Sequence, residues 1–129
     1  MTRDEILNMP AGRDIDALIA EKVMGWARDN SDEGDYFDFW STDPKDTENT
    51  KVQLLTYKFS EVITLAWGLV EKLGLVVGID ANPEVPDSPW CASIDWENHR
   101  QSTFTAWAPS APLAICRVVL LLVTSEDRG

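Results

Sequence analysis

Hydrophobic side chains recur at helical spacing near the start of the chain. Thr2 and Glu5 have the spacing of a capping box, which predicts a single helical turn ending at Asn8. A longer helix is expected over residues 10–26, because Pro10 suits a first helical position. The apolar residues that follow repeat every three or four positions, as on one face of a helix: Ile15, Leu18, Ile19, Val23 and Trp26.

Two further helices are predicted in the second half. Ser60 is a suitable N-cap, Glu61 suits the positive end of the helix dipole and Gly74 suits the C-terminal end. Between them runs one apolar stripe: Ile63, Ala66, Trp67, Val70 and Leu73. Ser110 is expected to cap the last helix, in which residues 113–123 are apolar nearly all round. That helix should be buried on most sides.

Three segments between these helices have the alternation of β-strands: residues 75–80, 90–96 and 102–108. Residues 97–101 would form a hairpin loop, and the prolines at 83, 86 and 89 predict a loop of roughly 8–10 residues before the second strand. The order helix, helix, three antiparallel strands, helix predicts an α+β fold whose sheet packs against helices.

Residues 29–50 differ from their surroundings in charge and in aromatic content. They hold eight Asp and Glu residues against Lys45 alone, and so carry seven of the eleven surplus negative charges of this 129-residue chain. Their glycine, proline and short polar residues predict a long loop, inserted in a single domain over residues 1–129. Four aromatic residues are too apolar for a solvated linker, so we expect contact with the domain or a partner: Tyr36, Phe37, Phe39 and Trp40.

The net charge of −11 argues against binding to DNA, RNA or an anionic membrane, because such binding would oppose the field of the whole protein. Cys91 and Cys116 lie in no His/Cys cluster, and the first residues have no basic segment followed by an apolar one. An intracellular protein with free thiols is therefore expected. The apolar run 113–123 is interrupted by Arg117 and is shorter than the roughly 20 residues that span a bilayer.

Residues that could carry out catalysis are few. The single histidine, His99, lies in the predicted hairpin loop, where a nucleophile pair would need a third group to fix it. No glycine-rich phosphate loop or zinc-binding helix motif occurs. Residues 29–34 resemble the start of a calcium-binding loop, but Trp40 stands where the twelfth position needs a bidentate glutamate. We therefore expect no catalytic residue, metal or cofactor.

Tryptophan is the more informative residue type, with six in the chain. Trp26 and Trp67 lie on apolar helix faces and are expected in the core. Trp90, Trp96 and Trp107 fall on the predicted sheet or its loops. There they could be core residues, form an oligomer interface or stack on a nucleobase, which contributes about 1–3 kcal/mol per base.

Two arginines are candidate phosphate partners. Arg100 lies beside His99 in the predicted hairpin loop, whereas Arg117 interrupts the apolar last helix. A largely buried arginine must be paired, either with an internal carboxylate or with a ligand anion. The candidate ligand-binding set is therefore Trp90, Trp96, His99, Arg100, Trp107 and Arg117.

Three segments resemble the phage ABA-sandwich domain family, a group of small proteins of phages and prophages. They are MTRDEILNMPAGRDIDALIAEKVMGW at the start, AWGLVEKL in the third predicted helix and APSAPLAICRVVLLL in the last. The resemblance implies a phage-encoded accessory protein, made in the cytoplasm of the infected bacterial host, with a sheet packed between helices. Residues 29–50 depart from the family pattern, in which the first two helices are joined by a shorter and less acidic segment.

Size and build are also similar to those of phage proteins that sequester cyclic nucleotides or cyclic ADP-ribose isomers made by bacterial immune systems such as Thoeris. This similarity implies an anti-defence protein that binds a nucleotide-derived signal without catalysis. One alternative is an acidic module that inhibits a host protein through residues 29–50. Another is a small hydrolase, which would need a nucleophile or metal that the sequence does not show. A homo-oligomer is expected in each case, because so small a domain has little interior for this many large aromatic residues.

Overall fold

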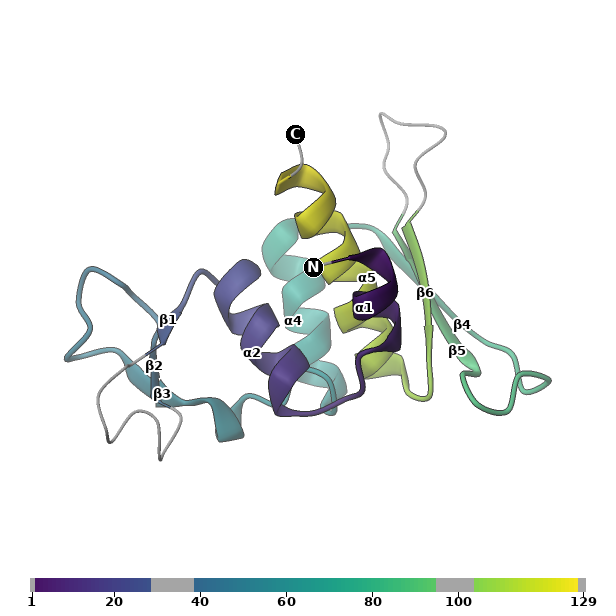
Figure 1. The fold of residues 1–129 in the computed structure, drawn as a ribbon, viewed down its shortest axis with the longest axis horizontal. Helices are drawn as coiled ribbons and strands as arrows, with labels where there is room; N and C mark the ends of the chain where they lie inside the picture. Colours follow the sequence, from purple (N-terminus) through teal and green to yellow (C-terminus); the bar gives the residue numbers. More distant parts are fainter. Residues whose placement is uncertain (1, 29–38, 95–103, 128–129) are drawn as a thin grey trace.

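The computed structural model describes residues 2–28, 39–94 and 104–127. Its main body is a group of helices packed against one side of a three-stranded sheet (Figure 1). The helices are α1 (Arg3–Asn8), α2 (Arg13–Lys22), α4 (Ile63–Leu73) and α5 (Ala111–Asp127), with a 3-10 turn η1 (Leu54–Thr56). The strands are β1 (Ala27–Arg28), β2 (Phe39–Ser41), β3 (Lys51–Gln53), β4 (Val77–Ala81), β5 (Trp90–Ile94) and β6 (Phe104–Ala108). The predicted α+β class is confirmed.

Helix α5 forms the centre of the core. Every residue from Leu113 to Leu122 is at most 7% exposed, and α5 contacts β5 and β6 as well as α1, α2 and α4. The Leu113 N–H donates to Ser110 Oγ, which is the predicted cap. Burial on most sides, expected from the apolar sequence, is thus confirmed. Among the described residues, no helix has the length and apolar character needed to span a membrane.

Helix α1 begins as predicted, but α2 is shorter than the expected helix over residues 10–26. Thr2 Oγ1 accepts a hydrogen bond from the N–H of Glu5, which is half of the predicted capping box. Helix α2 begins only at Arg13, because its N-cap Gly12 has a non-helical backbone conformation with φ of 145°. The helix ends at Lys22.

The α2 terminus leads Trp26 into the core. The Trp26 N–H donates to the Ala20 carbonyl, and Gly25 between them takes the left-handed conformation with φ of 72°. The indole is 8% exposed and meets the Tyr57 ring edge-on with centroids 5.0 Å apart. The prediction that Trp26 is a core residue is confirmed.

Two predictions about α4 are wrong. The N-cap is Val62, which makes no side-chain cap, and not Ser60. The buried residues of α4 are Ala66, Leu69 and Val70, a face rotated from the predicted stripe, so Trp67 remains 38% exposed and lies outside the core. The helix does end at Gly74, in the left-handed conformation with φ of 64°.

Strands β4, β5 and β6 form an antiparallel sheet in sequence order, as predicted. The proline-rich segment between β4 and β5 is the expected loop, and the Asn82 N–H closes it by donating to the Pro89 carbonyl. Four of the residues that face the helices are fully buried: Ala92, Ile94, Ala106 and Ala108. The predicted hairpin loop at 97–101 lies outside the described residues.

A second antiparallel sheet, β1-β2-β3, corrects the prediction of a long loop over residues 29–50. Strand β2 lies within that segment because Trp40, 3% exposed, belongs to the core, as expected for an aromatic residue held against the domain. Its cross-strand neighbour Arg28 places its guanidinium carbon 5.9 Å from the indole centroid. The possible calcium loop at 29–34, Tyr36 and Phe37 lie outside the described residues.

Candidate functional site

The face of the β4–β6 sheet that points away from the helices, the outer sheet face, carries the exposed Trp107. Side chains alternate along each strand, so the neighbours of the buried Ala92, Ile94, Ala106 and Ala108 point the other way. The outer sheet face therefore consists of Gly78, Asp80, Cys91, Ser93, Thr105 and Trp107. Figure 1 shows α1, α2, α4 and α5 together on the opposite side of this sheet.

Trp107 stands beside small, polar neighbours. It is directly opposite Cys91, and the next pair along the two strands is Ser93 with Thr105, whose hydroxyl oxygens are 3.3 Å apart. The indole is 42% exposed, although the neighbouring Cys91 is buried. An exposed indole above small residues offers a flat apolar surface with hydrogen-bonding groups beside it. Asp80 is the one charged residue among the six.

Trp90 does not share this face. It pairs with Ala108 at the start of β5, so it points to the helix side of the sheet, where it is 36% exposed. Trp90 and Trp107 therefore cannot hold one ring between them. Trp96, His99 and Arg100, the other candidates from this part of the sequence, lie outside the described residues.

Arg117 is bound by backbone carbonyl groups. Its Nε and Nη2 both donate to the Met9 carbonyl, at 3.2 and 2.8 Å, and Nη1 donates to the Trp107 carbonyl at 2.6 Å. Burial lowers the pKa of the guanidinium, whose residue is 7% exposed. Among the described residues, the partners are therefore backbone carbonyls and not the internal carboxylate weighed from the sequence. The guanidinium instead ties β6 and the residue after α1 to α5.

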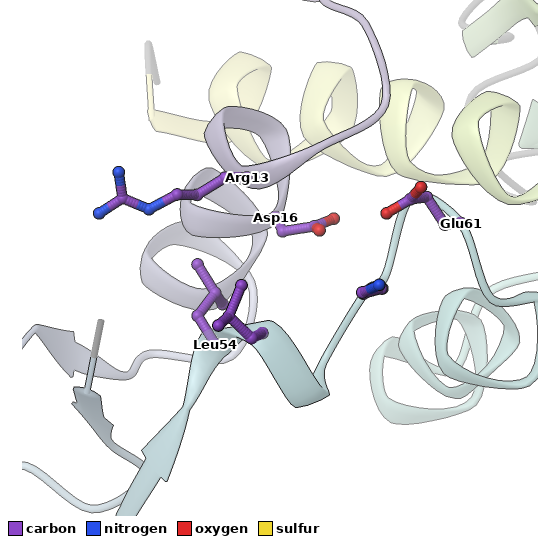
Figure 2. A pocket seen from close by; sticks show the side chains of 6 residues that line it. Arg13, Asp16, Leu54 and Glu61 are labelled. Carbon is purple, nitrogen blue, oxygen red and sulfur yellow. The ribbon is translucent and has the colours of Figure 1, made fainter. Parts of the chain in front are cut away.

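A pocket that the sequence did not suggest lies between α2, η1 and the turn before α4 (Figure 2). Its lining is Arg13, Asp16, Leu54, Leu55, Lys58 and Glu61, and its volume is about 60 Å³. Asp16 is 4% exposed, and Figure 2 shows its carboxylate and that of Glu61 pointing toward one another. We call this the Asp16 pocket.

Ser60 holds the buried side of the Asp16 pocket together. Its N–H donates to Asp16 Oδ1 at 2.9 Å, and its hydroxyl oxygen accepts the Gly12 N–H at 3.0 Å. This residue, expected to cap α4, thus binds the first turn of α2 instead. These two partners are 44 and 48 residues away from Ser60 in the sequence, so the local sequence pattern could not reveal them.

Burial raises the pKa of Asp16, and the negative charge of Glu61 raises it further, whereas the Ser60 hydrogen bonds and Lys58 lower it. Asp16 in turn adds to the effect of burial in raising the pKa of Cys116, a buried free thiol on α5. Within the described residues, no three His, Cys, Asp or Glu side chains are placed to hold a metal ion. One sequence signal could have marked this site: Asp16 is a carboxylate on the same helix face as Ile19, Ala20 and Val23.

Comparison with known proteins places the chain in a family. The model of the family described as "Phage ABA sandwich domain" matches residues 17–118. A crystal structure of a phage protein from Bacillus cereus ATCC 14579 is similar in fold, with a TM-score of 0.62 and 24% sequence identity. The similarity covers 88% of this chain and 92% of that one. No curated protein matches the chain.

Proposed function

The chain belongs to the Phage ABA sandwich domain family, and from this premise we propose that it is an accessory protein that sequesters a nucleotide-derived immune signal. The proposed ligand is a cyclic oligonucleotide or a cyclic ADP-ribose isomer, bound in the cytoplasm of the infected host without chemical turnover. The observation that carries the proposal is the exposed indole of Trp107 on the outer sheet face.

The chemistry of the outer sheet face supports a stacked base. A purine ring on an indole gains about 1–3 kcal/mol, and hydroxyl groups such as those of Ser93 and Thr105 can bond to its edge. Phosphate groups need cations, which strands β4, β5 and β6 lack. His99 and Arg100, on the segment that joins β5 to β6, remain the proposed phosphate partners. A second copy of the chain, as expected of a homo-oligomer, would seclude such a ligand from water.

The first prediction concerns Trp107→Ala. We expect loss of the indole face to weaken ligand binding about tenfold, because stacking is removed. Calorimetric titration with a panel of cyclic dinucleotides, cyclic trinucleotides and cyclic ADP-ribose isomers measures the change. Trp67→Ala is the matched control, since Trp67 is 38% exposed and lies on α4. Equal affinities of the two variants, or no binding of any panel member by the natural chain, would contradict the proposal. Mass spectrometry of the ligand after incubation tests whether it stays intact.

A second candidate function is supported by the concentration of charge in residues 29–50. Asp46 and Glu48, in the described part of this segment, are exposed beside the small sheet. An acidic surface of this kind favours a basic protein partner in the host. Deletion of the whole segment is unsuitable as a test, because it would remove the buried Trp40 of β2.

The second prediction therefore concerns substitutions that remove charge from this segment and keep Trp40 in place. Asp46→Asn with Glu48→Gln is expected to lower recovery of a basic host protein from lysate several-fold at low salt. Exposed charges at the edge of an interface attract an oppositely charged partner over a long range, and these substitutions remove two of them. Quantitative mass spectrometry of the captured proteins measures recovery. Glu21→Gln with Glu71→Gln makes the same charge change on exposed helix positions and should leave recovery unchanged. Equal losses from both pairs would exclude a specific role for the segment.

A further inference from the structure

We propose that the Asp16 pocket binds a primary ammonium group carried on an aliphatic chain. This site is separate from the outer sheet face: Figure 1 shows α2 and the small sheet on one side of the helices and strands β4 to β6 on the other. The proposal therefore does not depend on the function proposed for Trp107.

The Asp16 pocket has room for a small group. Its volume of about 60 Å³ exceeds the roughly 10–15 Å³ that a cavity needs to hold one water molecule. The end of an aliphatic chain that carries an ammonium group can therefore enter the pocket.

The charges inside the pocket favour a cation. The carboxylates of Asp16 and Glu61 point toward one another (Figure 2), and the pKa of Asp16 is raised although Lys58 lies nearby. Figure 2 also shows the Arg13 guanidinium directed away from both carboxylates. A buried carboxylate facing a second one is costly unless a positive charge lies between them. An ammonium group with three N–H donors could bond to both.

The remaining walls suit an aliphatic stem. Leu54 is 2% exposed and Leu55 is 60% exposed, so apolar surface leads from the inside of the pocket to its mouth. Methylene groups that pack along this wall would leave water, which favours binding of an aliphatic stem. A calcium ion fits less well, because the two carboxylates of the lining supply fewer oxygen ligands than the roughly six to eight that calcium takes.

Lys58, which also lines the pocket, is an internal competitor for this position. It lies close enough to lower the pKa of Asp16, but its effect ranks below that of Glu61, which raises it. Among the described residues, Arg13 on α2 and Cys116 on α5 are further charged or titratable groups near Asp16. Since Asp16 must be ionised, ammonium binding should strengthen as the pH rises through its raised pKa.

The test uses 1-aminobutane as the probe and 1-butanol as its uncharged counterpart. Titration is followed through the backbone amide signal of Ser60, which donates to Asp16. We expect 1-aminobutane to shift this signal saturably and 1-butanol to leave it unchanged. Asp16→Asn and Glu61→Gln should each weaken the amine about tenfold, the loss expected for one charge-assisted hydrogen bond. Glu71→Gln, an exposed change of equal charge on α4, should have no effect.

Two further probes distinguish the source of the ammonium group. Tighter binding of 1,4-diaminobutane would identify a free alkyl diamine, and tighter binding of Nα-acetyl-lysine amide would identify a lysine side chain of a partner protein. Non-saturable shifts, or equal weakening by Glu61→Gln and Glu71→Gln, would overturn the proposal. Because Glu61 is exposed, its variant keeps the test valid even if Asp16→Asn disturbs folding. Failure here would leave the Trp107 result unaffected.

Discussion

Replacing Arg117 with alanine is expected to lower the free energy of unfolding by about 3–4 kcal/mol. The substitution removes the three hydrogen bonds that the charged guanidinium donates. The carbonyls of Met9 and Trp107 then lack this donor. Each such loss costs about 1–3 kcal/mol. Urea unfolding at neutral pH measures the change.

The geometry of the guanidinium, and not its charge alone, should account for this effect. Lysine keeps the charge but cannot place two N–H groups on one carbonyl and a third on another. The free energy of unfolding of Arg117→Lys is therefore expected to fall by about half as much as that of Arg117→Ala. Lys72→Met, at an exposed position near the end of α4, is the control and should change stability by less than about 0.5 kcal/mol. A loss below about 1 kcal/mol in Arg117→Ala would show that these bonds contribute little.

The sequence predicts that Arg117 is paired, but it does not predict its acceptors. An arginine in a helix that is otherwise apolar must be paired, and the pairing is observed. Its acceptors were not foreseeable, because every residue has a backbone carbonyl and no side-chain pattern marks the two that Arg117 uses. The same limit applies to Ser60. The local sequence indicated a cap of α4, whereas the observed partners are Gly12 and Asp16 at the start of α2.

The long elements were predicted from hydrophobic period, and the short ones were not. Helix α5 and strands β4 to β6 have enough residues for a repeat of 3.6 or 2.0 to be recognised. Strands β1, β2 and β3 have two or three residues each, which is too short for alternation to be detected. Acidic residues around β2 further concealed it. Trp67 was misplaced because α4 turns a different face to the core from the one its apolar stripe indicated.

Asp16→Ala is expected to lower the free energy of unfolding by about 2 kcal/mol, whereas Asp16→Asn should change it by less than about 1 kcal/mol. Alanine leaves the fully buried Ser60 N–H without an acceptor; the asparagine carbonyl can still accept that hydrogen bond. Asparagine also removes the charge that burial and Glu61 disfavour. The comparison requires urea unfolding of the natural chain and both variants.

The difference in stability between the natural chain and Asp16→Asn should depend on pH, because the pKa of Asp16 is raised in the folded chain. Because the pKa of Asp16 is raised above 3.8 in the folded chain, the folded state retains a proton that the unfolded state releases. As the pH falls from the raised pKa toward 3.8, the natural chain should therefore gain stability relative to Asp16→Asn. The advantage of asparagine should be greatest at neutral pH and should shrink across that interval. A difference that stays constant over the interval would mean that the pKa of Asp16 is the same in both states, and that its buried charge is fully compensated by Ser60 and Lys58.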